Sequence, residues 1–217
     1  MGRVRIKMCG TTRREDVECA VRLGIDAVGF IFVKKSPRYV DPTHAAGLIS
    51  GLPPFVSRVG VFVNQSLDSI KQITESTGLT QLQLHGDESG TYCRELKDWN
   101  RGVSICKAFL VGEGRPLPAF GEYSDCIDSV LLDTYVKGKD GGTGKTFDWN
   151  CVRDLPITRP LILAGGLNPD NIEAAIESAR PYAVDVNSGV EDQPGVKNHV
   201  LLERLVSAVR RADRLLS

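Results

Sequence analysis

Four side chains able to take part in chemistry stand at or near the ends of expected strands: Cys9, His85, Asp133, and Arg38 in the loop K-K-S-P-R-Y-V. A thiol, an imidazole and a carboxyl can move protons, and a guanidinium binds carboxylates or phosphates. This set indicates acid–base chemistry on an anionic ligand. The alternatives are a small buried thiol, a satisfied interior histidine, a carboxylate that braces a loop, and a solvated surface arginine.

Cys9 and Asp133 are the strongest candidates for a base and an acid. Lys7 precedes Cys9 by two positions, so both face the same side of an extended strand, roughly 7 Å apart. A nearby ammonium favours the thiolate, which predicts a Cys9 pKa below the usual value of about 8.5. Asp133 closes the apolar run V-L-L, where burial would raise its pKa and suit it to donate a proton.

Two glycine-containing turns late in the chain predict a phosphate site. Gly165 and Gly166 follow P-L-I-L-A, and Ser188 and Gly189 follow A-V-D-V-N. Glycine allows the backbone to approach a ligand closely, and backbone N–H groups at turns and helix starts attract anions. Asn168, with Pro169 behind it, predicts a helix start directly after the first turn. Two ordinary tight turns are the alternative.

These residues are positioned by a regular alternation of strands and helices. In the expected fourth strand, 80–85, alternation places Leu82 and Leu84 on one side and Gln81, Gln83 and His85 on the other. That pattern suits a barrel, with leucines against the helices and polar groups in the lumen. The strands are expected at 3–8, 26–33, 58–63, 80–85, 103–108, 129–133, 160–164 and 183–187. We therefore predict a single-domain (β/α)8 TIM barrel over 1–217, in which strand ends carry the active site.

The alternative fold is an open, doubly wound sheet, which the absence of a GxGxxG motif after the first strand disfavours. The stretch 135–146 contains G-G-T-G-K-T, but Lys139 stands where a phosphate-binding P-loop needs its first glycine. Four glycines at 138, 141, 142 and 144 instead predict a mobile lid over the site.

Composition excludes several classes of partner. The chain of 217 residues has 27 Lys plus Arg against 27 Asp plus Glu, so no basic field suggests nucleic acid. No apolar run of about 18 residues predicts a membrane span, and no secretory leader is recognisable. Six cysteines without a CxxC pair argue against zinc and suit a cytoplasmic protein. We expect no metal, no cofactor, a small phosphorylated substrate, and a monomer or homodimer.

Several motifs, in this order, resemble those of the phosphoribosylanthranilate isomerases of tryptophan biosynthesis, nearly end to end. They are K-M-C-G at 7–10, G-F-I-F-V-K-K-S-P-R-Y-V at 29–40, Q-L-H-G at 83–86, L-L-D-T at 131–134, G-G-T-G-K-T-F-D-W at 141–149, L-A-G-G-L-N-P-D-N at 163–171 and D-V-N-S-G-V-E at 185–191. The departures are small: Met8 replaces a frequent isoleucine, and Asn198 stands where aspartate is expected.

The resemblance implies a (β/α)8 barrel that performs an Amadori rearrangement without metal or cofactor. It implies that Cys9 is the general base, Asp133 the general acid and Arg38 the group that engages the anthranilate carboxylate. It assigns the turns at 165–166 and 188–189 to the substrate phosphate. A histidine-pathway or dual-pathway sugar isomerase is an alternative, but that chemistry uses aspartate where this chain has Cys9. A barrel that only binds phosphosugars is another.

Overall fold

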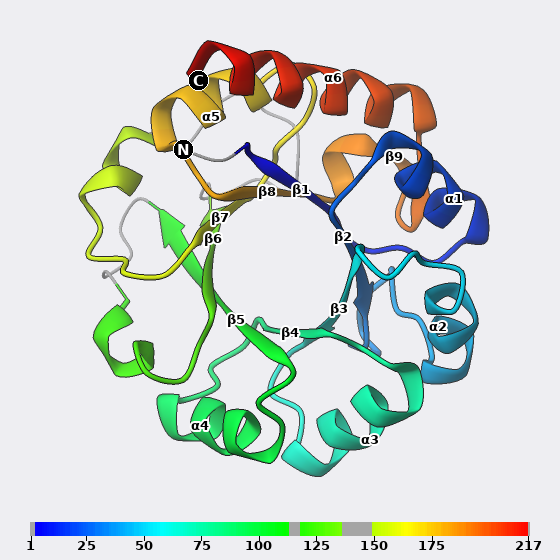
Figure 1. The fold of residues 1–217 in the computed structure, drawn as a ribbon, viewed down its shortest axis with the longest axis vertical. Helices are drawn as coiled ribbons and strands as arrows, with labels where there is room; N and C mark the ends of the chain where they lie inside the picture. Colours follow the sequence, from blue (N-terminus) through cyan, green and yellow to red (C-terminus); the bar gives the residue numbers. More distant parts are fainter. Residues whose placement is uncertain (1–2, 113–117, 136–148, 217) are drawn as a thin grey trace.

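The structure is a computed structural model and describes residues 3–112, 118–135 and 149–216. The predicted lid at 135–146 therefore lies almost wholly outside the described residues. Eight parallel strands form a closed barrel in sequence order (Figure 1). The strands are β1 Arg5–Met8, β2 Ala27–Ile31, β3 Ser57–Phe62, β4 Gln81–Leu84, β5 Ser104–Gly112, β6 Ser129–Tyr135, β7 Leu161–Ala164 and β8 Ala183–Val186. Pairing of β1 with β8 closes the barrel and confirms the predicted fold class.

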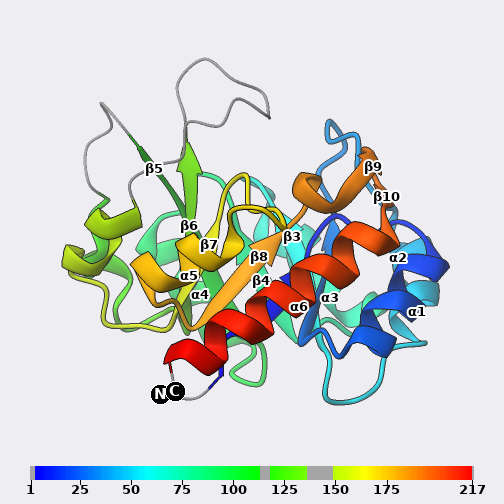
Figure 2. The same ribbon diagram turned by 90° about the horizontal axis from the view of Figure 1, so that it is seen from above.

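Helices surround the barrel (Figure 2): α1 to α5 each connect two consecutive strands, and α6 follows the last strand. They are α1 Arg14–Leu23, α2 Pro42–Ile49, α3 Leu67–Thr77, α4 Gly90–Trp99, α5 Ile172–Ala179 and α6 His199–Leu216. The 3₁₀ helices η1 Phe120–Tyr123 and η2 Trp149–Asp154 lie before β6 and β7. After β8, the chain forms η3 Ser188–Val190 and a small hairpin, β9 Glu191–Gln193 with β10 Val196–Lys197. Sequence patterns did not predict this hairpin, whose strands are only two and three residues long.

Helix starts follow local capping chemistry in some places and tertiary contacts in others. Ser66 caps α3, because its hydroxyl accepts a hydrogen bond from the Ser69 N–H. Thr12 carries the local pattern of a helix cap, with Glu15 three residues later, but its hydroxyl donates to the Gly195 carbonyl at 2.7 Å, and α1 begins at Arg14 without a side-chain cap. The helix start predicted at Asn168 is displaced: α5 itself begins at Ile172, but Asn168 opens the preceding turn, where its Oδ1 accepts from the Asp170 N–H at 2.9 Å and its carbonyl accepts from the Ile172 N–H at 3.1 Å.

The alternating strand pattern separates an outer from an inner core. Leu82 and Leu84 are fully buried in the large apolar cluster between barrel and helices, as predicted, whereas Gln83 lines the pocket inside the barrel. A separate cluster fills the lumen with Cys106, Ala108, Leu131, Ile162, Ala164 and Ala183. The outer layer drives folding through apolar burial, and the packed lumen gives the pocket a rigid floor.

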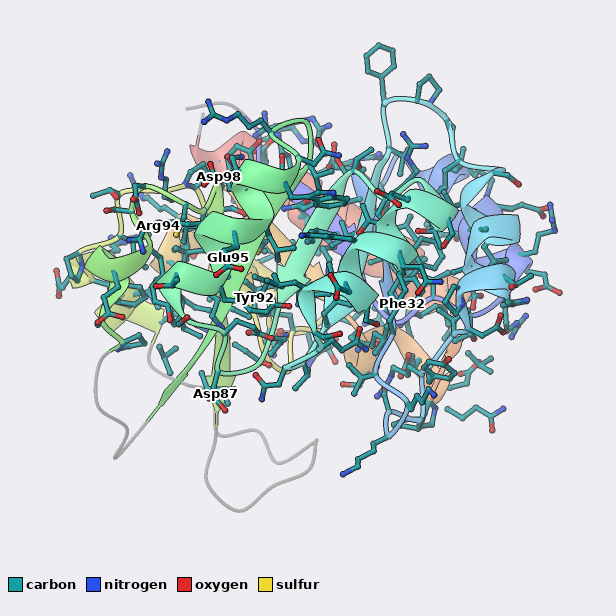
Figure 3. All side chains as sticks on the ribbon, turned by 90° about the horizontal axis from the view of Figure 1, so that it is seen from below. Phe32, Asp87, Tyr92, Arg94, Glu95 and Asp98 are labelled. Carbon is teal, nitrogen blue, oxygen red and sulfur yellow. The ribbon has the colours of Figure 1, made fainter. Side chains whose placement is uncertain are left out.

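The outer helices present polar faces to solvent and bury one side. Figure 3 shows Arg94, Glu95 and Asp98 on the outer surface of α4, while the Tyr92 hydroxyl donates to the Gln65 carbonyl at 2.7 Å. Within the described ranges, no helix is long and apolar enough to cross a membrane. In the same ranges, no group of three or more His, Cys, Asp or Glu residues is arranged to hold a metal ion.

Candidate active site

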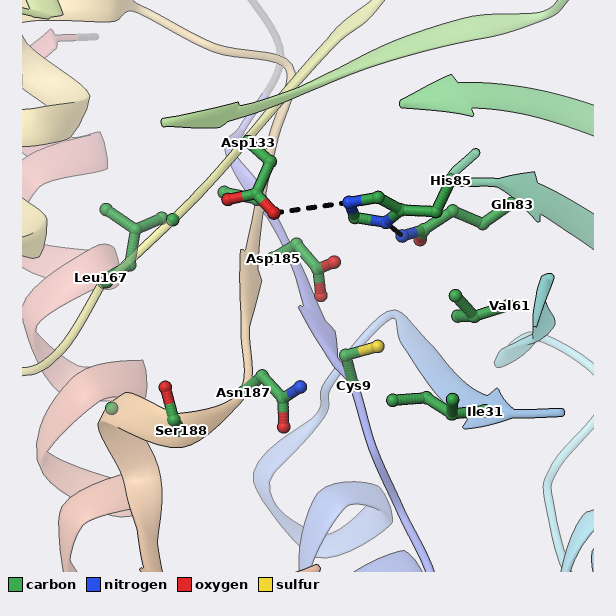
Figure 4. Close-up of a pocket in the computed structure, with 14 residues that line it drawn as sticks. Cys9, Ile31, Val61, Gln83, His85, Asp133, Leu167, Asp185, Asn187 and Ser188 are labelled. Atoms are coloured by element: carbon green, nitrogen blue, oxygen red, sulfur yellow. Dashed lines mark hydrogen bonds and ion pairs between the residues drawn. The ribbon is translucent and has the colours of Figure 1, made fainter. Parts of the chain in front are cut away.

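A pocket opens at the carboxyl ends of the barrel strands (Figure 4), the end where barrels of this type carry their active sites. Seven of the eight predicted site residues line it: Cys9, His85, Asp133, Gly165, Gly166, Ser188 and Gly189. Further lining residues are Ile31, Val61, Gln83, Ala164, Leu167, Asp185 and Asn187. The pocket thus brings together residues at or just after the ends of seven strands, β1 to β4 and β6 to β8, and of the predicted site residues only Arg38 lies outside the lining.

Cys9 follows β1, where its N–H donates to the Val186 carbonyl at 2.8 Å and so fixes the strand end. Its side chain is buried beside Gly29, whose missing Cβ would stand only 3.0 Å from the Cys9 sulfur. Burial raises the pKa of the Cys9 thiol, and the attraction of Lys7 offsets this only in part. The prediction of a lowered thiol pKa is therefore wrong, because desolvation outweighs the nearby ammonium.

Lys7 has a stronger partner than the thiol. Its Nζ lies 2.7 Å from Oδ2 of Asp185, and both side chains are buried in the lumen. Burial by itself lowers the pKa of Lys7, but the attraction of Asp185 and Cys9 raises it overall, so the ammonium keeps its charge. The ion pair places a permanent positive charge beside Cys9, ready to stabilise a thiolate when one forms.

Asp133 extends from β6 on another side of the pocket from Cys9, and its carboxylate accepts a hydrogen bond from His85 (Figure 4). The His85 Nε2 to Asp133 Oδ2 distance is 3.2 Å, and Gln83 Nε2 lies 2.9 Å from Nδ1. With the Gln83 amide as donor, Nδ1 accepts and Nε2 carries the hydrogen that points at Asp133. About a third of the Asp133 side chain is exposed, so the burial expected from its apolar strand is incomplete.

Three polar residues of the pocket were not predicted as site residues: Asp185 and Asn187, and Gln83, which the sequence places only on the lumen side of its strand. Within the described part of the chain, Oδ1 of Asp185 and Oε1 of Gln83 are buried without a hydrogen-bond partner. Buried polar atoms of this kind are costly unless a ligand or water satisfies them. The signal was present in the alternation of A-V-D-V, which directs Asp185 into the lumen as it does the polar residues of β4.

The two glycine turns after β7 and β8 lie against each other. Gly165 and Gly166 have φ values of 92° and 62°, which few other residues adopt. A Cβ on Gly189 would stand 2.0 Å from the Leu167 carbonyl oxygen, so no side chain fits there. The backbones of the two turns can meet here because position 189 is a glycine.

Arg38 lies at the margin of the pocket. Its Cδ and the Asn187 side-chain oxygen are each 2.7 Å from the point that a Cβ on Gly10 would occupy. Its guanidinium forms an ion pair with Glu191, with 2.6 Å between Nη2 and Oε2. The arginine that was expected to bind an anionic ligand is therefore held by a carboxylate of the protein.

A closed parallel barrel with proton-transfer groups at its strand ends, beside two touching glycine turns, defines a (β/α)8-barrel enzyme for small anionic substrates. Residues 6–208 match the N-(5'-phosphoribosyl)anthranilate (PRA) isomerase family, and the chain belongs to that family. An isomerase of this name from Thermotoga neapolitana is 48% identical over 210 residues, covering 95% of this chain and 98% of the relative.

Solved structures agree with this assignment. The phosphoribosylanthranilate isomerase of Thermotoga maritima superposes with a TM-score of 0.86 at 41% identity, covering 96% of this chain and 99% of that chain. Another phosphoribosylanthranilate isomerase, in complex with reduced 1-(o-carboxyphenylamino)-1-deoxyribulose 5-phosphate, has a TM-score of 0.79 at 36% identity, with 96% and 99% covered. A third structure, of monomers generated from the dimeric Thermotoga maritima enzyme, has a TM-score of 0.80 at 36% identity and covers 95% of this chain and 98% of that chain.

Proposed function

We propose that the chain, as one catalytic domain over 1–217, converts N-(5-phosphoribosyl)anthranilate to 1-(2-carboxyphenylamino)-1-deoxyribulose 5-phosphate in tryptophan biosynthesis. The observation that carries the proposal is the position of Cys9 and Asp133 in one pocket, next to two touching glycine turns. An acid and a base on separate strands can act on two positions of one sugar. Membership of the family supports the same activity. A histidine-pathway isomerase is not favoured, because Cys9 replaces its aspartate.

The proposed reaction uses two proton transfers. Asp133 donates a proton to the ring oxygen of the aminoribose, the C1′–O bond breaks, and the nitrogen lone pair forms a protonated Schiff base. This cation acidifies the hydrogen on C2′, which the Cys9 thiolate removes to give an enolamine. Tautomerisation of the enolamine, with protonation at C1′, yields the ketone. The proton that Asp133 gave stays on the freed hydroxyl and the proton from C2′ is on Cys9, so before the next turnover solvent returns a proton to Asp133 and takes one from Cys9.

Neighbouring groups support these steps. The Lys7 ammonium stabilises the Cys9 thiolate, and the His85 N–H orients the Asp133 carboxyl toward the pocket. The unpartnered Oδ1 of Asp185 accepts a hydrogen bond from a sugar hydroxyl. The glycine turns at 165–166 and 188–189 hold the phosphate through backbone N–H groups. No resident metal or cofactor takes part in this scheme.

Complementation tests the proposed function. A bacterial strain lacking phosphoribosylanthranilate isomerase should grow without tryptophan when it expresses this chain. The empty vector should give no growth. Expression of folded protein without growth would contradict the proposal and leave a phosphosugar-binding barrel as the alternative.

Inorganic phosphate should inhibit competitively, because it occupies the site of the substrate phosphate. A Gly166→Ala change strains a position with φ of 62° and should raise KM and the phosphate inhibition constant together by about tenfold, the loss of roughly one charge-assisted hydrogen bond. Gly121→Ala, in η1 and with open space at its Cβ, is the matched control. Unchanged phosphate inhibition in a folded Gly166→Ala protein would remove this turn from the phosphate site.

We propose a cytoplasmic homodimer. The related Thermotoga maritima enzyme is dimeric, and Phe55, between α2 and β3, is 98% exposed. Exposure of a phenyl ring to water is unfavourable, and burial of the ring in a subunit interface is therefore favourable.

Phe55→Glu should shift the sedimentation of the protein from dimer to monomer at micromolar concentration, because a charge replaces the apolar contact. Val200→Glu, on the exposed face of α6, should leave the dimer intact. A wild-type protein that sediments as a monomer, or a Phe55→Glu dimer of unchanged affinity, would contradict the assignment.

A further inference from the structure

Glu191, the first residue of β9, is a buried carboxylate between two cations. Arg38 donates to it from Nε, at 3.0 Å to each oxygen, and from Nη2 at 2.6 Å. Lys197 Nζ lies 2.7 Å from Oε1, and the Glu191 and Lys197 side chains are 3% and 0% exposed. Burial raises the pKa of Glu191, but the hydrogen bonds from Arg38 and Lys197 outweigh it and hold the pKa below its ordinary value. Two positive charges against one negative leave this cluster cationic.

The contact with Glu191 uses one particular edge of the guanidinium. A guanidinium has five N–H donors in a planar fork and can bind one carboxylate through Nε and Nη2 and a second through Nη1 and Nη2. Glu191 occupies the first edge. Within the described part of the chain, Nη1 makes no hydrogen bond. The second edge of Arg38 is therefore available for another carboxylate.

The same cluster is joined to the pocket. Lys197 Nζ also donates to Oδ1 of Asn187 at 2.9 Å, and Asn187 lines the pocket together with Cys9. The stem of Arg38 and the Asn187 side chain both lie against Gly10, the residue after Cys9. Displacement of Glu191 would therefore move the guanidinium relative to the catalytic thiol.

We propose that Glu191, supported by Lys197, is a positioning residue that holds Arg38 by its Nε–Nη2 edge, so that the opposite edge receives the aromatic carboxylate of the substrate. The inference rests on the proposed function for the identity of that carboxylate. A buried acid beside a substrate-binding arginine would ordinarily weaken anion binding. Here Lys197 compensates for the charge of Glu191. Because Glu191 already fixes the Arg38 side chain, its conformational entropy is lost on folding and not on substrate binding.

Glu191 also braces the hairpin, since Oε1 accepts a hydrogen bond from the Gly195 N–H at 3.2 Å. The test must therefore separate positioning from stability. Two probes do so. The carboxylated analogue is reduced 1-(o-carboxyphenylamino)-1-deoxyribulose 5-phosphate, and the des-carboxy analogue is the same compound without its carboxyl group. Their dissociation constants are measured by calorimetry, and KM and kcat are measured in parallel.

Glu191→Gln should weaken the carboxylated analogue about tenfold, raise KM similarly, and leave kcat and the affinity for the des-carboxy analogue within about twofold. Glu191→Asp keeps the negative charge on a shorter side chain that no longer reaches Arg38 in the same way, and it should weaken the carboxylated analogue selectively as well. Arg38→Ala should cost about 10- to 100-fold for the carboxylated analogue, and adding Glu191→Gln to it should cost no more than about twofold further. Glu173→Gln, which removes the charge from a surface ion pair with Arg211, is the matched control.

Three results would overturn the inference. Equal weakening of both analogues would show that Glu191 only supports the hairpin. Tighter binding of the carboxylated analogue by Glu191→Gln would show that it acts only as an opposing charge. Additive losses in the double variant would show that it acts independently of Arg38. Binding is measured directly, so the outcome for this inference is separate from the outcome for the proposed reaction. If the wild-type protein shows no turnover but prefers the carboxylated analogue, and Arg38→Ala loses that preference, the proposed reaction is contradicted and this inference stands.

Discussion

Replacing Cys9 by alanine should lower kcat/KM at least about 100-fold, the usual scale for a positioned general base. The fold should survive, because Cys9 follows β1 and lies in a small cluster with Ile31 and Val61 rather than in the main core. Cys19→Ala, which removes a buried thiol in α1 that does not line the pocket, is the matched control and should retain activity. Near-native kcat/KM in a folded Cys9→Ala protein would defeat the mechanism.

The pH dependence of the wild-type enzyme follows from the same residue. Burial raises the Cys9 pKa, so the thiol is protonated at neutral pH and the active thiolate forms as pH rises. We therefore expect the rate of Cys9 alkylation to increase with pH and to keep increasing above about 8.5, the ordinary thiol pKa. Bound substrate should slow this reaction. A plateau reached below pH 7 would show that the thiol pKa is lowered.

Replacing Asp133 by asparagine should also lower kcat at least about 100-fold, because the amide cannot donate a proton to the ring oxygen. Asparagine keeps the size of the side chain and an oxygen that can accept the His85 hydrogen bond, so the pocket should keep its shape. Asp125→Asn, on the surface and paired with Arg94, is the control.

The two variants should fail at different steps. Without Cys9 the ring still opens, and borohydride should trap the open-chain Schiff base as a reduced amine. Without Asp133 the ring stays closed, and little trapped amine should form. Equal trapping in both variants would contradict the assignment of separate proton transfers.

The arrangement of the barrel could be predicted from sequence because two patterns agree: the alternation of strands with helices along the chain, and the alternation of apolar with polar residues within a strand. Leu82 and Leu84 alternate with Gln83, a pattern that suits a closed sheet with a polar lumen, and the glycine turns after β7 and β8 line the pocket at the end where the sequence places the site. Helix starts were less predictable. Thr12 satisfies the distant Gly195 carbonyl instead of capping α1, and no local pattern contains that contact.

The electrostatics of the site depend on residues far apart in sequence. Lys7 was expected to act on Cys9, but its closest partner is Asp185, 178 positions away. Arg38 is likewise held by Glu191 across 153 positions. Neither pair can be recognised without the fold, because burial decides both which charges must pair and how far a thiol pKa rises.

The most direct test of the account is turnover by the purified wild-type protein, followed as the loss of phosphoribosylanthranilate fluorescence. We predict a first-order loss proportional to enzyme concentration, with 1-(2-carboxyphenylamino)-1-deoxyribulose 5-phosphate as the product and competitive inhibition by phosphate. A folded protein that binds the reduced product analogue, yet leaves the fluorescence decaying at the rate seen without enzyme, would contradict the account.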